Sequence, residues 1–306
     1  MTTELTLPKS ELLFLYESTY SIPNGDPFTG EQRFDEETKR VLVSDVRIKR
    51  FIRDYLFDTG TDIYVRNDRS NVKEDGDAEA GAAARYNTLE KNAANGTSAQ
   101  DILTQLIDVR LFGGILTKKG TAINLTGPVQ FALLNPSLNA VDLRMHQNTA
   151  VFASKTDNTR GAIGTTTVVP YALCQIHGWI NPYSARHTNL TQNDIQTMFS
   201  ALWNSINNAN TRTKSNQSSL LLLQIVYAEP TRKVYGLGDA IKLAPGTRDG
   251  NPLRDEQIRS REDYSLNFDR LRSIAASPAV SEILFYTEAD DLRAQLSGDK
   301  FRAMEI

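Results

Sequence analysis

A run of basic residues in the first part of the chain is suited to binding an anionic polymer. Six lysines and arginines fall within 39–53, against the single acid Asp45. The segment 44–57 is predicted to be a helix, because Ser44 is a good N-cap and apolar residues recur at helical spacing. Four cations lie on or beside one face of this helix: Arg47, Lys49, Arg50 and Arg53. A face of one sign favours phosphate binding, since a face built only for solubility usually mixes Glu with Lys.

The alternative interpretation of this helix is an ordinary amphipathic helix with a solvated charged face. The residue types favour the nucleic-acid interpretation, because arginine binds phosphate oxygens through two N–H groups and stacks on bases. The formal net charge of -3 argues against it only superficially, since nucleic-acid binding depends on a local basic surface.

The segment 23–27 is a predicted turn, because it combines two prolines, an Asn-Gly pair and an aspartate. Gly25 would let another backbone approach closely, and Asn24 offers donors to phosphate or ribose. An ordinary turn is the alternative. Asp26 could instead hold a metal that activates a water for RNA cleavage. Such a site needs further converging carboxylates or histidines, and none can be placed beside Asp26 from the sequence.

The remaining residues that could do chemistry are few. The three histidines and the single cysteine form no metal-ligand spacing, and no metal or cofactor is predicted. One cysteine excludes an internal disulfide and is typical of a reducing, cytoplasmic compartment. No secretory signal or membrane-spanning segment is expected. The segment 108–114 is typical of a strand that runs into the glycine pair Gly113-Gly114, and the pair indicates either a bend in the strand or a surface that an RNA backbone approaches. Gly236 and Gly238 lack a phosphate-binding spacing.

The elements that must position these candidate residues are expected to include both helices and strands. The sequence predicts a polar, partly helical insertion over 60–100 and a hairpin or loop over 139–168. The order strand, helix, two strands, helix, strand is typical of an α+β ferredoxin-like or RNA-recognition-motif fold, although unrelated proteins share it. The expected elements are strand 11–22, helix 44–57, strands 106–116 and 122–134, a helix opened by Thr191, strand 219–228, helix 268–276, strand 282–286 and a polar tail.

Several motifs in this order resemble a known family. They are Asn24-Gly25-Asp26-Pro27, the block 43–56, Asp108-Val109-Arg110-Leu111-Phe112-Gly113, Gly127-Pro128-Val129-Gln130-Phe131, Val169-Pro170-Tyr171, the segment 190–194 and Tyr235-Gly236-Leu237-Gly238-Asp239. Together they resemble the CRISPR-associated backbone subunit of type I-B Cascade complexes, the DevR-like branch of the Cas-seven family. The block 43–56 is the longest and most specific of them.

The resemblance implies one RNA-recognition-motif palm over 1–306, with a helical fingers insertion at 58–105 and a hairpin thumb at 139–168. Copies of such a subunit stack along a guide crRNA and present it for pairing with a target DNA strand. The other implied partners are the remaining Cascade subunits: the large subunit, the small subunit and the guide-end caps. Because guide sequence varies, the implied contacts are to phosphate and ribose.

The resemblance also implies which residues contact the guide. On the palm these are Asn24, Ser44, Arg47, Lys49, Arg50 and Arg53; on the thumb they are Lys155, Arg160 and Thr165; Gly25, Arg110 and Gln130, within the quoted motifs, complete the expected set. Related type III subunits cut target RNA with an aspartate in a comparable palm loop, where Asp26 lies here. The type I resemblance is closer, so no enzymatic activity is expected.

Overall fold

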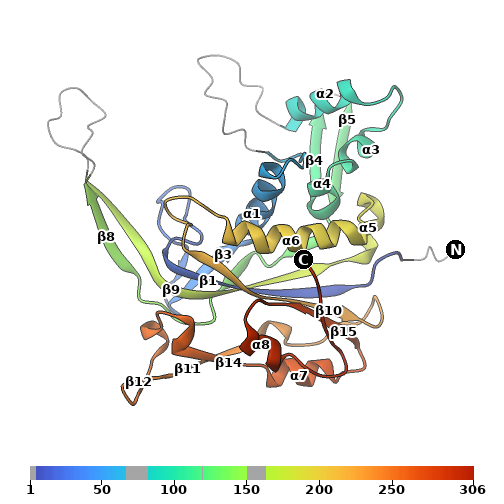
Figure 1. Cartoon of the computed structure of the whole chain (residues 1–306). Helices are drawn as coiled ribbons and strands as arrows, with labels where there is room; N and C mark the ends of the chain where they lie inside the picture. The colour runs from blue at the N-terminus through green and yellow to red at the C-terminus, as the bar shows by residue number, and fades with distance from the viewer. Residues whose placement is uncertain (1–4, 67–81, 119, 150–162) are drawn as a thin grey trace, which may run out of the picture.

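The computed structural model describes residues 5–66, 82–118, 120–149 and 163–306 (Figure 1). Its centre is a sheet whose strands follow the order β16-β15-β10-β1-β9-β6, with β8 paired to β9. The strands of this sheet are β1 (Ser10–Ser21), β6 (Val129–Phe131), β8 (Arg144–Thr149), β9 (Ile163–Ile180), β10 (Gln217–Tyr227), β15 (Val280–Tyr286) and β16 (Phe301–Ala303).

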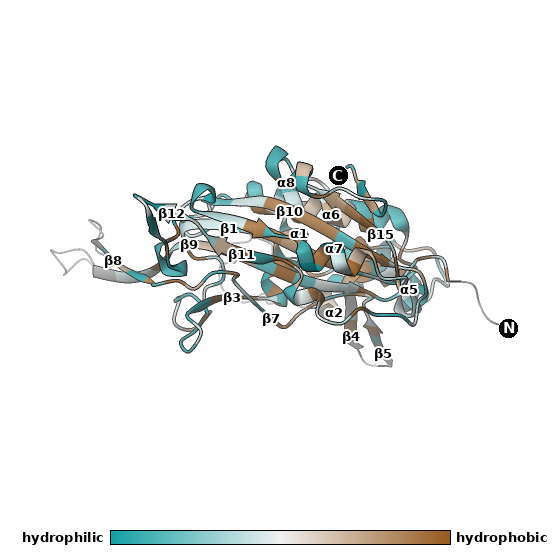
Figure 2. Cartoon of the chain, turned by 90° about the horizontal axis from the view of Figure 1, so that it is seen from below, coloured by the Kyte–Doolittle hydropathy of each residue, from teal (hydrophilic) through white to brown (hydrophobic). Residues whose placement is uncertain are grey.

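Strand β1 occupies the middle of the sheet and is antiparallel to both β9 and β10. Its side chains alternate between the two faces, as the two-residue period of a strand requires. Leu12, Phe14 and Tyr16 enter one core cluster, whereas Leu13 and Leu15 enter the other. The predicted strands 11–22, 219–228 and 282–286 are therefore confirmed as β1, β10 and β15, and Figure 2 shows hydrophobic residues along their central parts.

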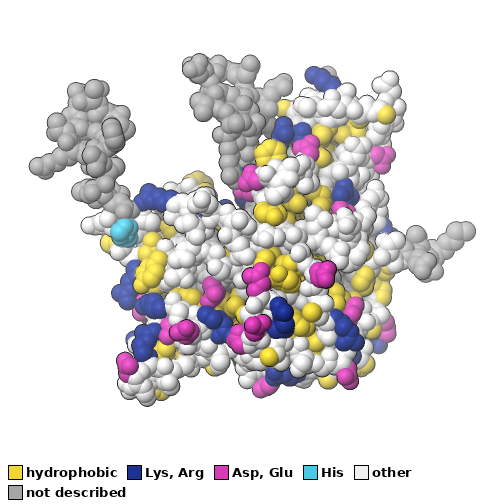
Figure 3. All heavy atoms as spheres, in the orientation of Figure 1, with side chains coloured by type: hydrophobic (Ala, Val, Ile, Leu, Met, Phe, Trp, Pro, Cys, Tyr) yellow, Lys and Arg dark blue, Asp and Glu magenta, His cyan; other side chains and the backbone are white. Residues whose placement is uncertain are grey.

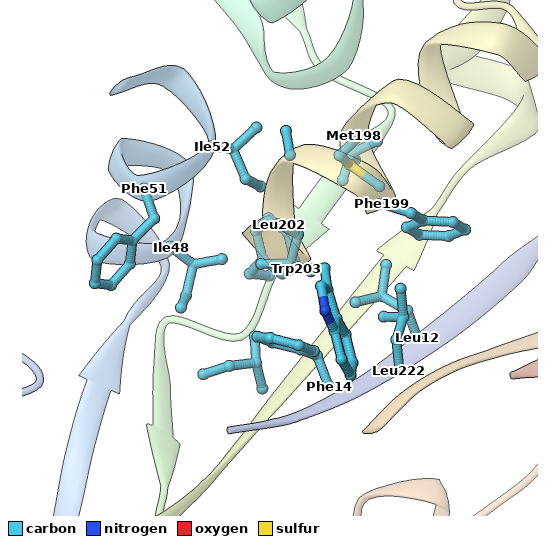
Figure 4. Packing of buried hydrophobic residues seen from close by; sticks show 14 of the residues in the cluster. Leu12, Phe14, Ile48, Phe51, Ile52, Met198, Phe199, Leu202, Trp203 and Leu222 are labelled. Carbon is cyan, nitrogen blue, oxygen red and sulfur yellow. The ribbon is translucent and has the colours of Figure 1, made fainter. Parts of the chain in front are cut away.

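Helices α1 (Asp45–Asp58) and α6 (Gln192–Asn207) pack against each other over one face of the sheet (Figures 1 and 4). In the close-up, Ile48 and Ile52 of α1 lie toward Leu202 of α6, and Trp203 lies beside Phe14 of β1. Both predicted N-caps are confirmed. The Ser44 side chain accepts from the Arg47 N–H, and Thr191 forms a capping box with Asp194.

The opposite face is covered by the C-terminal segment, including α7 (Asp269–Ala275) and α8 (Asp290–Gln295). The predicted helix 268–276 is confirmed as α7. The prediction of a polar tail is wrong in part, because α8 buries Leu292, Leu296 directly after it is also buried, and β16 adds a parallel edge strand. The small strands on this side are β11 (Lys242–Pro245), β12 (Thr247–Arg248), β13 (Asn251–Pro252) and β14 (Tyr264–Asn267).

A separate unit projects beside α1 and α6 (Figure 1). It has its own small core, which includes Tyr64, Tyr86 and Leu103. Its elements are α2 (Ala82–Asn92), α3 (Ala99–Thr104), α4 (Ile107–Phe112), β4 (Gly113–Lys118) and β5 (Thr121–Thr126), and α5 (Pro182–Thr188) packs beside it. The expected helical content of 60–100 is confirmed by α2 among the described residues.

The predicted strand 106–116 is wrong over its first half, which forms helix α4. Its β-branched and aromatic residues favoured a strand, but tertiary contacts on all sides bury the short helix. The predicted strand 122–134 is divided between β5, β6 and the start of β7 (Leu134–Pro136). Strand β7 pairs with β3 (Arg40–Ser44), which also pairs with β2 (Phe34–Asp35).

Strands β8 and β9 form the hairpin that the composition of 139–168 predicted, and it extends away from the main body (Figure 1). The part of β9 that pairs with β1, residues 169–180, is a central strand that was not predicted from the sequence. Among the described residues, no helix is long and apolar enough to cross a membrane.

The glycines around 113 bring two pieces of protein backbone together. Gly113 has φ +77, and a Cβ there would lie 2.0 Å from the Leu125 carbonyl oxygen. A Cβ on Gly127 would lie 2.0 Å from the Phe112 carbonyl carbon. Glycine is therefore required at both positions, because only a hydrogen fits in the space. The close approach expected at the Gly113-Gly114 pair is made by the protein's own chain.

Candidate nucleic-acid interface

The turn after β1 is joined to the N-terminus of α1 through Asn24. This side chain is buried, and its Oδ1 accepts from the Ser44 N–H at 2.7 Å and from the Ser44 hydroxyl at 2.8 Å. Its Nδ2 donates to the Gly25 carbonyl at 3.3 Å. The amide of Asn24 thus serves the junction between turn and helix, and the structure places Asn24, Gly25 and Ser44 together as expected.

Asp26 is engaged within the same turn. Its Oδ1 accepts from the N–H groups of Phe28 at 2.9 Å and Thr29 at 3.3 Å, and its Oδ2 lies 3.2 Å from the Arg33 guanidinium. The Phe28 N–H, with these other partners, lowers the pKa of the Asp26 carboxyl. Within the described part of the chain, no group of three His, Cys, Asp or Glu side chains is placed to hold a metal ion.

The prediction that α1 carries a basic face of one sign is wrong, because carboxylates on the same helix pair with its cations. Lys49 Nζ lies 3.1 Å from Asp45, and Arg50 Nε lies 2.6 Å from Asp54, both at i,i+4 spacing. Lys49 also donates to the Gln130 amide oxygen at 3.2 Å. Figure 3 shows the same mixture more widely, with Asp and Glu side chains among the Lys and Arg side chains.

Arg53 has a different environment from the other cations of α1. Its Nε donates to Asp108 Oδ2 at 3.0 Å, and the Asp108 side chain is 0% exposed. Asp108 also accepts from the N–H groups of Tyr64 at 2.7 Å and Val65 at 3.0 Å. A buried carboxylate with three donors is a structural connection between α1, α4 and the start of the projecting unit.

Arg110 and Gln130 are also held by protein partners. Arg110 makes a two-pronged contact with Asp194, Nε to Oδ2 at 2.9 Å and Nη2 to Oδ1 at 2.7 Å. Burial raises the pKa of Asp194, but hydrogen bonds from Arg110 and Thr191 more than offset this effect and leave it lowered. Gln130 donates to the Gly127 carbonyl at 2.9 Å. Arg110 thus connects α4 to α6.

Arg47 lies in the first turn of α1. Its guanidinium carbon sits 3.7 Å above the centroid of the Phe51 ring. Lys214, on the loop between α6 and β10, lies close enough to Arg47 for their charges to interact. Burial, together with Arg47, lowers the pKa of Lys214 to about 8. Sequence analysis missed Lys214, because it follows Asp58, the last residue of α1, by 156 positions and its loop has no distinctive motif.

On the hairpin, Thr165 is exposed and pairs with Gln147 across the two strands. Lys155 and Arg160 lie outside the described residues, so their predicted role stays a prediction. Residues 235–238, which belong to the quoted motifs, line a hollow of about 400 Å³ together with the buried Glu11.

The arrangement resembles known protein folds. A chain of a CRISPR RNA-guided surveillance complex in a pre-nicking state matches with a TM-score of 0.50 and 13% identity, covering 92% of this chain and 93% of that one. A chain of a second CRISPR RNA-guided surveillance complex matches with a TM-score of 0.51 and 15% identity, and the match covers 92% of this chain and 90% of that one. The class is therefore a mixed α+β protein with the fold of these chains.

The particular family follows from the sequence. The family described as CRISPR-associated protein Cas7 matches residues 8–269, and the chain belongs to it. A relative from Haloferax volcanii, also described as CRISPR-associated protein Cas7, is 28% identical over 287 residues, which is 87% of this chain and 82% of the relative.

Proposed function

We propose that this protein is a non-catalytic backbone subunit of a type I-B CRISPR Cascade effector. Copies would bind along a guide crRNA and hold it for pairing with a target DNA strand, together with the large subunit, the small subunit and the guide-end caps. The observation that carries the proposal is the family match over 8–269. Its support is the fold similarity, over 92% of the chain, to chains of RNA-guided complexes.

We infer that the central sheet is a palm of the RNA-recognition-motif type. The supporting observation is the set β1, α1, β6, β9, α6 and β10, which follows the order strand, helix, two strands, helix, strand. These four strands lie in the spatial order β10-β1-β9-β6 and are antiparallel to their neighbours. Both helices cover one face, as in a ferredoxin-like arrangement.

The insertions proposed from the sequence have counterparts in this architecture. The fingers, placed at 58–105, are supported by the separate small core, which also takes in α4, β4 and β5. The thumb, placed at 139–168, is supported by the β8–β9 hairpin, which extends from the body. We propose a cytoplasmic location, which the single buried, unpaired cysteine supports.

The ion pairs on α1 are compatible with phosphate binding at some positions. The Arg50–Asp54 pair is partly exposed, with side chains 33% and 25% accessible. Such pairs contribute only about 0.3–0.5 kcal/mol, so a phosphate can compete with the carboxylate. If Arg53 bound a phosphate instead, the buried carboxylate of Asp108 would lose the cation that pairs with it. We therefore propose Arg50, together with Arg47 and Lys49, as guide contacts of α1. Arg53 is assigned to the fold because its partner Asp108 is fully buried, whereas Asp45, the partner of Lys49, is 17% exposed.

The direct test is to purify the full-length chain from cells that also carry the other Cascade subunits and a guide array. The expected result is co-purified RNA of uniform length, in a particle that contains several copies of this chain. Preparations from the same cells without the array are the control. A stable complex free of RNA would refute guide binding, and RNA bound by a single copy would refute the backbone role.

A further inference from the structure

The loop between α6 and β10 is fixed against the end of β1 by three hydrogen bonds. The Thr19 N–H donates to the Asn216 carbonyl at 2.9 Å, and the Ile22 N–H donates to the Thr213 carbonyl at 2.8 Å. Lys214 Nζ donates to the Ile22 carbonyl at 2.8 Å. These bonds place Lys214 at the start of the turn that leads, through Asn24, to the N-terminus of α1. Its position is therefore set by the fold.

Lys214 differs from the cations of α1 in its electrostatic surroundings. No carboxylate oxygen among the described residues lies within 4.0 Å of its ammonium, whereas Lys49, Arg50 and Arg53 each have one. Its hydrogen bonds go to the Ile22 carbonyl and, at 3.3 Å, the Thr213 hydroxyl, which leaves one of three donors. Among the described residues, Arg47 lies close enough for its positive charge to act on Lys214, and the two cations repel each other. An anion between them would relieve that repulsion.

An exposed aromatic residue, Tyr20, lies in the chain between Thr19 and Ile22, whose N–H groups bond to the loop 208–216. Tyr20 is 62% exposed and has φ +44, a conformation that is unusual for a non-glycine residue. Its place in the β1–β9 ladder falls opposite Pro170, which has no N–H to donate. Backbone strain of this kind costs about 1–3 kcal/mol and tends to occur at functional sites. Exposed tyrosines are suitable platforms for unstacked bases.

We propose that Lys214 and Arg47 bind one phosphodiester of a single-stranded RNA, and that Tyr20 contacts the adjacent base or ribose. This nucleotide site lies at the junction of β1, α1 and the loop 208–216. The exposed Arg212, two residues from Lys214, adds to its positive potential. The inference rests on the proposed function, because it takes RNA as the ligand, and adds Lys214 and Tyr20 to the residues expected to bind it.

The test measures binding of a labelled single-stranded oligouridylate to the purified full-length chain over a series of salt concentrations. Each phosphate contact on a single strand contributes about 0.7 to the slope of log affinity against log salt. Lys214→Gln is expected to lower that slope by about this amount, and Lys214→Arg to preserve it. Lys242→Gln is the matched control, because this exposed lysine lies on β11, on the other side of the sheet.

Tyr20→Asn removes the ring but keeps a residue that tolerates the left-handed conformation. It is expected to weaken binding at least about fivefold, the lower end of base–aromatic stacking, with the salt slope unchanged. A Lys214→Gln protein with lower thermal stability but an unchanged slope would show a purely structural lysine and overturn the proposal. Wild-type protein that binds no RNA would instead refute the proposed function itself.

Discussion

Replacing Arg53 by Ala should destabilise the protein far more than replacing Arg50 by Ala, although both arginines lie on the same helix. Arg53 is 14% exposed and pairs with Asp108, which is fully buried. In Arg53→Ala, Asp108 would keep only its two backbone N–H donors. Removing one partner of a buried pair costs about 3–5 kcal/mol. Arg50→Ala breaks a partly exposed i,i+4 pair, which costs about 0.3–0.5 kcal/mol.

The assay is urea denaturation followed by tryptophan fluorescence, since Trp203 is buried between α6 and the sheet. The two variants should differ by about 3 kcal/mol in free energy of unfolding. The double variant Arg53→Met with Asp108→Asn removes both charges and should regain much of the loss, because no uncompensated buried charge remains. Equal unfolding free energies for Arg53→Ala and Arg50→Ala would refute the assignment of Arg53 to the fold.

Three further predictions concern other sites. Burial, together with the charge of Arg47, lowers the pKa of Lys214 to about 8, so its ammonium loses its proton as the pH rises from about 7 to 9. RNA affinity should therefore fall over this range in the wild type and less in Lys214→Arg, and parallel profiles for the two proteins would contradict this. Gly127→Ala should lower the melting temperature sharply, because its Cβ would lie 2.0 Å from the Phe112 carbonyl carbon. Gly114→Ala, whose Cβ would meet its nearest neighbour at an ordinary 3.6 Å, is the milder control, and equal losses would contradict the explanation. Complex incubated with complementary RNA and Mg²⁺ should leave that RNA intact, and cleavage that disappears in Asp26→Ala would show an endoribonuclease instead.

The elements with local signals could be predicted from the sequence. Helices α1 and α6 carry their own N-caps and apolar spacing, so Ser44 and Thr191 marked their starts without any tertiary information. Strand β1 was evident from its run of large apolar residues before a turn. Helix α4 could not be predicted in this way, because its β-branched residues favour a strand. Tertiary packing, which buries most of its side chains, makes the segment helical instead.

The candidate site could be predicted only in part. The Arg50–Asp54 pair lies four residues apart and was visible in the sequence, although the count of basic residues stopped before Asp54. The partner of Arg53 is 55 positions away, and Lys214 approaches α1 from the far half of the chain. Pairings at such separations depend on the tertiary fold, so composition and spacing cannot reveal them.

Strand β9 runs from the middle of the sheet into the β8–β9 hairpin without interruption. Its 18 residues extend over about 60 Å at the usual rise of a strand. Because a continuous paired strand contains no hinge, the direction of the hairpin is coupled to the twist of the sheet at its base. In a filament of stacked copies, a small change of twist beneath β1 would be amplified at the hairpin tip. The helical pitch of such an assembly would thus depend partly on the core packing of each subunit.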